Sequence, residues 1–352
     1  MKAVLVILVA LFALSACETV SYYGQAVSGQ LQILGQRRQI ESLIADNRTD
    51  PGLKARLSRV LEIRQFAETG LGLPLEKTFS SYVELQRPYV VWNVFATPEF
   101  SMQPLQWCYP IAGCVSYRGY FREPAALRFA AGLADENHDT YVAGVAAYST
   151  LGWFSDPVLS TVINREDYQL ASLIFHELAH QLLYIPGDTA FNESFATALA
   201  QEGLKRWLEH CGLDTDASTA ILERVQADYD RRQEFVSLVQ ETATELEQLY
   251  RSDKPAPEMR KAKQAVLDRL RSRYQQVKSA WGGYDGYDNW FSGDINNARI
   301  NTVSTYFSLV PAFNALLAEE QGDLPAFYAR VRQLQEMDKA QRQAFLAARL
   351  DQ

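Results

Sequence analysis

The sequence has no excess of positive charge and only one long apolar run. Lys and Arg number 34 against 42 Asp and Glu, which gives a net charge of −8 over 352 residues. A nucleic-acid binder normally shows a basic footprint, so the charge argues against that class. The one long apolar run lies at the N-terminus, which excludes a polytopic membrane protein. With 19 Gly and 13 Pro, collagen-like and low-complexity chains are excluded too.

The residues that are present can build a substantial core. Hydrophobic residues make up 47% of the chain and aromatic residues 12%. At roughly 100–200 residues per domain, the length fits one large domain or two of ordinary size. The composition therefore indicates an ordinary globular protein.

The N-terminal segment has the pattern of an export signal. Lys2 precedes the apolar run 3–14, which is too short to span a bilayer and ends in Leu-Ser-Ala before Cys17. This resembles the bacterial lipobox, so residues 1–16 are predicted to be a signal peptide and Cys17 to be lipidated. The body would then face the periplasm, anchored to the outer membrane rather than the inner one because Glu18 is not Asp. An ordinary cleaved signal with an incidental cysteine is the alternative.

Two cysteines lie close together in a turn-rich segment. Cys108 and Cys114 enclose Pro110 and Gly113, both good turn residues. Because an exported chain meets an oxidising compartment, a local disulfide between them is predicted. The alternative is two reduced cysteines in a turn.

The hydrophobic pattern changes along the chain. Residues 18–68 show helical spacing, and residues after 168 again indicate helices with short breaks. Between them, residues 89–95, 113–121 and 141–148 are rich in β-branched and aromatic side chains, which predicts strands. The fold class expected is α+β and predominantly helical, with a small, mostly antiparallel sheet.

A long amphipathic pattern suggests an insertion in the single domain 17–352. Residues 216–251 have helical periodicity, a Pro-containing turn follows at 253–258, and a second amphipathic stretch runs to 281. We interpret residues 213–281 as a helical hairpin insertion. Charge runs such as Arg231-Arg232 are interpreted as a solvated helix face.

The segment His176-Glu177-Leu-Ala-His180 carries the clearest chemistry. Its flanks are helical in pattern, so two imidazoles at i and i+4 project from one face at the spacing that one divalent metal needs. Glu177 is turned about 100° round the helix, where it can reach water bound to the metal without binding the ion. This arrangement is typical of the zinc-protease helix.

Glu193 is the predicted third ligand. After His180 the helix continues for about one turn, a short loop follows, and Asp188 or Thr189 can cap the next helix. Glu193 then returns to the level of His180 on an antiparallel neighbour. Its face continues through the small residues Ala196, Thr197 and Ala200, which would let the two helices approach closely.

These motifs also carry a family resemblance. The His176-Glu-x-x-His180 and Asn192-Glu193-x-x-Ala196 pair resembles the gluzincin class of zinc peptidases. The lipobox, the Cys108–Cys114 segment, residues 117–121, and Asn296-Asn297 with residues 309–313 are together similar to a proteobacterial family called putative aminopeptidases. The likeness covers nearly the whole mature chain and implies a zincin-like core.

The resemblance implies roles for individual residues. His176, His180 and Glu193 would hold one Zn²⁺, and Glu177 would be the general base. Asn192 and Thr197 are expected to support the ligands, with a helix-face Thr as the alternative for Thr197. Separately, Tyr306 is a candidate oxyanion stabiliser, against the alternative of a packed helix aromatic.

The function expected is zinc-dependent hydrolysis of peptides by a membrane-tethered enzyme. Aminopeptidase and endopeptidase activity both remain open, since the segment from 143 to 150 lacks a carboxylate that could hold a free amine and the Gly-Ala-Met-Glu-Asn motif of large aminopeptidases is absent. A non-catalytic periplasmic scaffold that retains the metal site, or a zinc hydrolase acting on another bond, are the alternatives. A peptide substrate, a lipid anchor and no nucleic acid are the partners expected.

Overall fold

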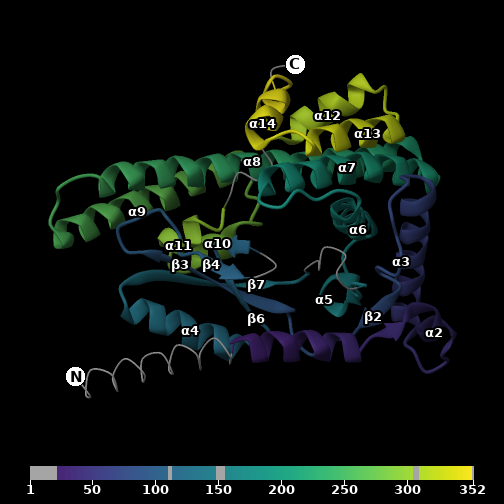
Figure 1. The fold of residues 1–352 in the computed structure, drawn as a ribbon, viewed down its shortest axis with the longest axis horizontal. Helices are drawn as coiled ribbons and strands as arrows, with labels where there is room; N and C mark the ends of the chain where they lie inside the picture. Colours follow the sequence, from purple (N-terminus) through teal and green to yellow (C-terminus); the bar gives the residue numbers. More distant parts are fainter. Residues whose placement is uncertain (1–21, 110–112, 148–154, 304–308, 351–352) are drawn as a thin grey trace.

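A computed structural model describes residues 22–109, 113–147, 155–303 and 309–350, and Figure 1 shows their arrangement. The fold is α+β and mostly helical, as the sequence predicts. The predicted signal peptide, Cys17 and Tyr306 lie outside the described residues. No helix in the described part is both long and apolar enough to cross a membrane.

The first described helices lie along the lower edge and the right-hand side of the molecule in Figure 1. A helix at residues 22–35 leads into a two-residue strand, β1 (Arg38–Gln39), and two helices, α2 (Ile40–Ala45) and α3 (Pro51–Thr69). A turn separates the last two helices, and the Asp50 carboxylate accepts a hydrogen bond from the Leu53 amide at the start of α3.

The strands form three small sheets in the described residues, whereas one sheet was expected. The largest has the antiparallel order β6-β3-β7, from β3 (Val91–Pro98), β6 (Arg118–Tyr120) and β7 (His138–Val145). A second has the order β1-β2-β8, in which β2 (Ser81–Val83) pairs antiparallel with β1 and parallel with β8 (Val158–Leu159).

The third sheet contains the predicted disulfide. β4 (Trp107–Tyr109) and β5 (Gly113–Val115) form a hairpin in which Cys108 and Cys114 face each other and are bonded. The expected strand at 113–121 is therefore split: its first part pairs within this hairpin, and its last part becomes β6 in a different sheet.

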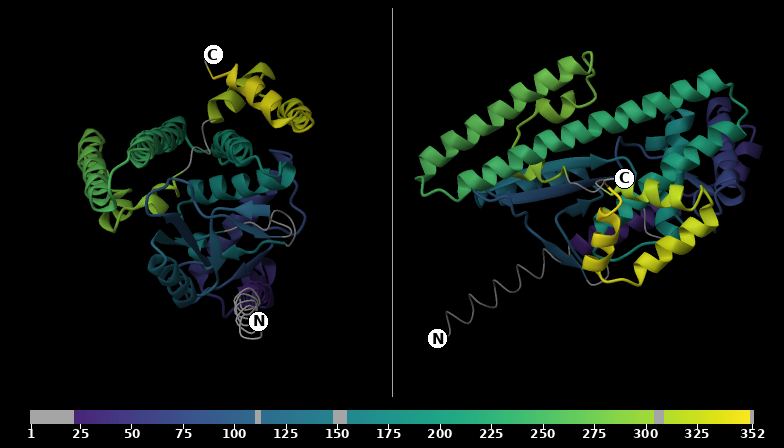
Figure 2. Two further views of the ribbon diagram at one scale, coloured as in Figure 1. Left: turned by 60° about the vertical axis from the view of Figure 1, so that its left-hand side comes forward. Right: turned by 90° about the horizontal axis from the view of Figure 1, so that it is seen from above.

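Helices cover the upper part of the molecule in layers (Figures 1 and 2). The short α5 (Ser160–Ile163) precedes α6 (Asp167–Leu182) and α7 (Thr189–His210), which pack closely. Two long helices, α8 (Thr215–Tyr250) and α9 (Ala256–Ala280), then lie side by side within the range interpreted as a hairpin insertion. The remaining helices are α4 (Glu123–Asp135), α10 (Asp288–Ser292), α11 (Asn297–Ile300), α12 (Val310–Glu319), α13 (Leu324–Gln335) and α14 (Lys339–Ala347).

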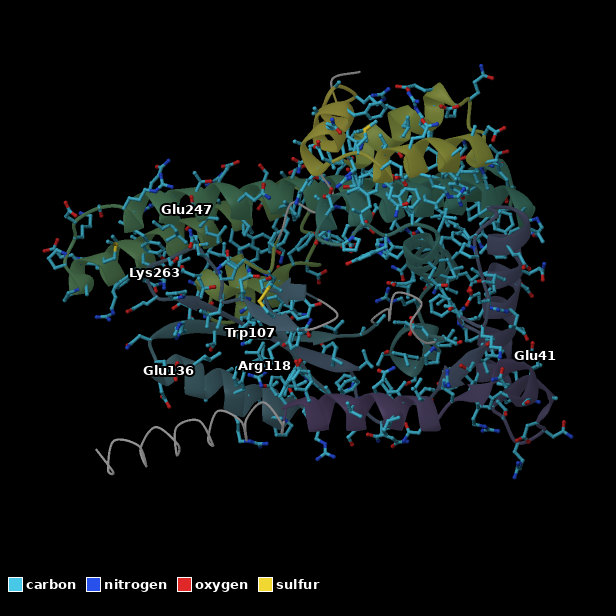
Figure 3. The ribbon with its side chains drawn as sticks, viewed as in Figure 1. Glu41, Trp107, Arg118, Glu136, Glu247 and Lys263 are labelled. Atoms are coloured by element: carbon cyan, nitrogen blue, oxygen red, sulfur yellow. A yellow bond between two sulfur atoms is a disulfide. The ribbon has the colours of Figure 1, made fainter. Side chains whose placement is uncertain are left out.

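The long hairpin is fastened to the β6-β3-β7 sheet by a partly buried polar network. The Lys263 ammonium of α9 donates to Asp139 at 2.5 Å and to the Glu99 carbonyl at 3.0 Å (Figure 3 labels Lys263). The Asn297 amide also donates to Asp139, and Tyr250 of α8 donates to the Asn297 side chain. Because the charge and amide groups satisfy one another, this contact holds the hairpin against the sheet.

Close contact between α6 and α7 depends on a glycine, Gly203 of α7, which has no side chain. A Cβ atom placed on Gly203 of α7 would lie 2.9 Å from the Phe175 ring and 2.8 Å from Leu71. Both neighbours are fully buried, so neither can move aside freely. The small face predicted for α7 therefore includes this glycine, which holds the two helices at short range.

We expect Gly203→Ala to lower the stability of the protein. The methyl group should cost about 1–3 kcal/mol by overpacking, which outweighs the gain of about 1 kcal/mol in helix propensity. Urea unfolding of the variant would show a lower midpoint with an unchanged slope. Gly132→Ala is the control, because its Cβ meets nothing within 4 Å on α4. An equal midpoint for both variants would contradict the close approach.

Candidate metal centre

Helix α6 has a capping box at its N-terminus and carries the two histidines in its C-terminal half. Glu166 and Gln169 form a reciprocal capping box at its N-terminus. A stripe of buried apolar side chains then faces the core, namely Leu170, Ala171, Ile174, Phe175, Leu178 and Ala179. His176 and His180 lie at the edge of this stripe, one turn apart on one side of the helix.

The loop between α6 and α7 is held by side chains of α7 itself. The buried Asn192 accepts a hydrogen bond from the Ile185 amide at 2.8 Å and donates to the Ile185 carbonyl at 2.8 Å. The Asp188 carboxylate accepts from the Phe191 amide and caps α7, as the sequence predicted. Asn192 thus fixes the tight turn rather than contacting a histidine, and this turn brings the two helices back alongside each other.

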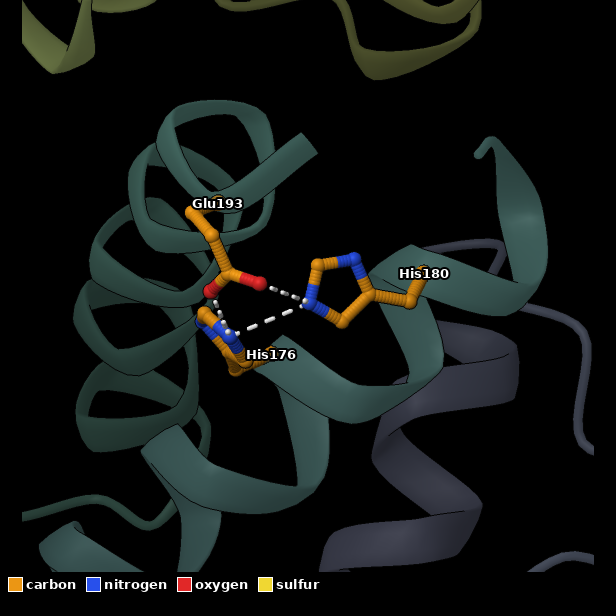
Figure 4. A group of neighbouring side chains, drawn as sticks. All are labelled: His176, His180 and Glu193. Carbon is orange, nitrogen blue, oxygen red and sulfur yellow. Dashed lines mark hydrogen bonds and ion pairs between the residues drawn. The ribbon is translucent and has the colours of Figure 1, made fainter. Parts of the chain in front are cut away.

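Glu193 meets both histidines across the two helices (Figure 4). Its Oε2 atom lies 3.3 Å from His176 Nε2, and its Oε1 atom lies 3.6 Å from His180 Nε2. The two Nε2 atoms are 3.2 Å apart, with the rings nearly perpendicular. The folded chain therefore brings together the three residues that the sequence selected as ligands.

These separations fit one small divalent cation. A tetrahedral ion with ligand bonds of about 2.0–2.1 Å has ligand atoms about 3.3–3.4 Å apart. The three observed distances of 3.2, 3.3 and 3.6 Å bracket that value. Two imidazoles and one carboxylate are also a ligand set of catalytic zinc sites, in which the fourth position is left for water or substrate. The group could therefore hold a metal ion and leave a fourth position for another ligand.

His180 is kept neutral by its surroundings. Its side chain is buried, and this burial lowers the pKa of His180 to about 4, with the nearby His176 adding to the shift. Its Nδ1 atom is buried and has no hydrogen-bond partner among the residues that the structure describes. Because one ring nitrogen of a neutral imidazole carries no proton, His180 at pH 7 can bind a metal ion without first releasing a proton.

This low pKa predicts a titration in the metal-free protein. We expect the His180 ring to titrate near pH 4 instead of 6.5 when followed by NMR, and His180→Asn would identify its signal among the four histidines. Because the unfolded chain binds the proton more readily between these pH values, this residue makes the free energy of unfolding rise with pH across that window. A titration at 6.5 would contradict the burial.

Glu177 lies beside the three ligands but is not one of them. Its carboxyl group borders a small cavity together with Asp156 and Phe79. Burial raises the pKa of Glu177, with Glu193 and Asp156 adding to the shift and His176 opposing it. The side chain therefore sits in an apolar pocket next to the candidate metal position, within range of the charge on His176.

A comparison with known families gives independent evidence. A family model described as putative aminopeptidase matches residues 21–346. The chain belongs to this putative aminopeptidase family. No curated protein and no solved structure matches it. The matched range includes both ligand helices and the long hairpin, and it ends within α14.

Two further residues interact with the ligands although their sequence context did not point to them. Arg232 of α8 acts electrostatically on Glu193. Burial opposes ionisation of Glu193, but the hydrogen bond with His176 and the charges of His180, His176 and Arg232 outweigh it and lower its pKa. Arg232 is nevertheless exposed to solvent, in agreement with the interpretation of Arg231-Arg232 as a solvated helix face, so its charge acts on Glu193 from an exposed position.

Arg231 is also engaged with the protein. Its guanidinium lies 4.4 Å from the centre of the Tyr284 ring and pairs with Asp228 at 2.7 Å. The second missed residue is Tyr184, whose ring lies 6.3 Å from that of His180. Burial raises the pKa of Tyr184, and the charge of Glu193 adds to the shift. Only its position one turn after His180 could have pointed to it.

The remaining predicted site residues have different outcomes. Thr197 is half-buried on α7, and no hydrogen bond joins it to either histidine within the described residues. Tyr306 lies in the undescribed segment 304–308, so its place relative to the site stays a prediction. Of the site residues named from sequence, His176, His180, Glu193 and Glu177 are the ones that gather in one place.

Proposed function

We propose that this chain is a zinc metallopeptidase of gluzincin type with a zincin-like catalytic core. One observation carries the proposal: the convergence of His176 Nε2, His180 Nε2 and the Glu193 carboxylate at 3.2–3.6 Å from one another. The family description adds peptide hydrolysis as the reaction. An intact Glu177 next to the ligands favours catalysis over a purely structural metal site, which would not need a base there.

The metal ligands and Glu177 have different roles in the proposed reaction. Zn²⁺ held by His176, His180 and Glu193 would polarise a peptide carbonyl and lower the pKa of a water molecule to about 7. Glu177 accepts the proton of the attacking water and then delivers it to the leaving amine. The partial burial of Glu177 strengthens its electrostatic interactions with the neighbouring groups of the site. Tyr306 remains our candidate for stabilising the oxyanion.

The family description favours an aminopeptidase over an endopeptidase. A comparison of free and N-terminally blocked peptides of one sequence decides between them. An aminopeptidase cleaves only the free peptides, because it requires the α-amino group. Equal rates on both would remove the aminopeptidase assignment but leave the metallopeptidase.

We also propose that the protein is exported and lipidated. The lipobox at Cys17 and the disulfide between Cys108 and Cys114 support this, because disulfides persist in oxidising compartments. The chain would then be anchored in the cell envelope and face the periplasm, at the outer membrane. Mass spectrometry of the N-terminal peptide tests the acylation.

Metal removal tests the central proposal. We expect purified protein to contain one zinc ion per chain, to lose peptide hydrolysis on treatment with a chelator and to regain it with added Zn²⁺. Glu193→Gln should bind zinc more weakly, because a neutral amide replaces a charged ligand, whereas Glu209→Gln at the exposed end of α7 should bind it normally. Protein that hydrolyses peptides without any bound metal would overturn the proposal.

A further inference from the structure

The helix at residues 22–35 has one face that is firmly attached to the body of the protein. The Gln25 side chain donates to the Gly119 carbonyl at 3.2 Å and accepts from the Phe121 amide at 3.0 Å. One turn later, Gly29 packs so closely on Phe121 that a Cβ atom would lie 2.1 Å from the ring. One further turn on, Ile33 is 1% exposed in the main core. This four-residue spacing defines the attached face.

The opposite face of the same helix is exposed and carries an apolar stripe, with the uncharged Ser28 and Gln32 beside it. Tyr23, Val27 and Leu31, again four residues apart, are 40%, 57% and 61% exposed. The solvent face of a surface helix normally carries charged side chains, but residues 21–36 contain none. Single exposed apolar residues need no explanation, whereas a regular stripe on an uncharged helix indicates a binding surface.

The start of this helix is fixed close to the proposed lipid. The Arg118 guanidinium carbon lies 4.2 Å from the centre of the Tyr22 ring (Figure 3 labels Arg118). The Tyr22 ring also stacks on that of Tyr109, with 5.8 Å between the ring centres. Four residues separate Cys17 from Tyr22, so the two Cα atoms can be at most about 18 Å apart. A lipid on Cys17 therefore brings the first turn of the helix to the membrane surface.

We propose that the helix at residues 22–35 lies on the membrane, with Tyr23, Val27 and Leu31 in the interface between headgroups and acyl chains. Tyr is favoured at this depth, and amphipathic helices lie in this plane with their apolar face embedded. The inference rests on the proposed lipidation of Cys17. In Figure 1 the helix lies along the lower edge and α7 lies in the upper part of the molecule, so the ligand helix α7 would lie on the side away from the bilayer.

A fluorescent label on the stripe tests this orientation. Full-length lipidated protein with Cys211→Ser and Val27→Cys is labelled with an NBD fluorophore and placed in vesicles of phosphatidylethanolamine and phosphatidylglycerol. We expect a blue-shifted emission that loses about half of its intensity to lipids brominated near the headgroup, since an interfacial face lies roughly 5–10 Å deep. A label at the exposed Gln276 of α9, as Gln276→Cys, should be neither shifted nor quenched.

The outcomes separate this inference from the proposals on which it rests. An unquenched, solvent-like label at residue 27 in protein whose Cys17 is acylated would overturn the membrane-lying helix and leave the anchor standing. A blue shift without quenching would mean that a second protein copy covers the stripe, which also overturns it. Protein whose Cys17 carries no acyl chain contradicts the lipidation itself, and the hydrolysis assay is independent of all three results.

Discussion

Glu177→Gln is expected to abolish most peptide hydrolysis and to leave the metal in place. The amide keeps the size of the side chain but cannot accept a proton from the attacking water. Positioned general bases contribute about 10²–10⁴-fold to rates, so kcat should fall by about that factor. Zinc content should remain at one ion per chain, because Glu177 lies beside His176, His180 and Glu193 without joining them. The measurement is kcat on one peptide together with zinc analysis.

The control for this variant is a carboxylate that the reaction does not use. Glu209→Gln removes an exposed carboxylate at the end of α7 and should retain full activity. If Glu177→Gln matched the wild type in kcat, the catalytic assignment would be wrong, whatever metal the protein contained. If instead the variant lost its zinc, Glu177 would be acting through the ligands, and its role as a base would have to be withdrawn.

The ligand triad could be predicted from sequence because each step is local. An i, i+4 pair fixes two side chains on one helix face, and a short loop with a capping Asp188 fixes the direction of the next helix. Glu193 then has to return beside His180, and the observed 3.6 Å contact follows from those two constraints. No distant part of the chain enters this argument.

Other features could not be predicted because they depend on distant contacts. Arg232 looks like any charged residue on an amphipathic helix, and its electrostatic effect on Glu193 depends on the packing of α8 against α7 in the folded protein. The strand predicted at 113–121 divides because its two halves find different partners, Trp107 to Tyr109 and β3. Periodicity identifies a strand but does not choose the strand with which it pairs.

The turn that positions the ligands is also held by a buried ion pair between Asp188 and Arg342 of α14. Arg342 of α14 donates from Nε and Nη2 to Asp188 at 2.9 and 2.7 Å, and both side chains are at most 5% exposed. Its Nη1 atom donates to the Met337 carbonyl at 2.8 Å. Since Asp188 also caps α7, the pair ties the start of the ligand helix to the end of the chain.

Arg342→Met is therefore expected to destabilise the protein strongly. Removing one partner of a buried pair leaves an uncompensated charge, which costs about 3–5 kcal/mol in the free energy of unfolding. Urea unfolding of the metal-free protein measures the loss. Arg349→Met, two residues after the end of α14, is the matched control: Arg349 pairs with the more exposed Glu319, and its loss should cost about 1 kcal/mol or less.

A double variant tests whether the buried charge causes the effect. In Asp188→Asn with Arg342→Met, the amide oxygen can still cap α7, but no unpaired carboxylate remains. The double variant should recover part of the stability lost in Arg342→Met alone, since buried neutral groups cost less than a buried charge. Additive losses would instead show that the two residues contribute independently, by packing and capping. In that case the turn that places Glu193 beside His180 would be held by Asn192 and not by the ion pair.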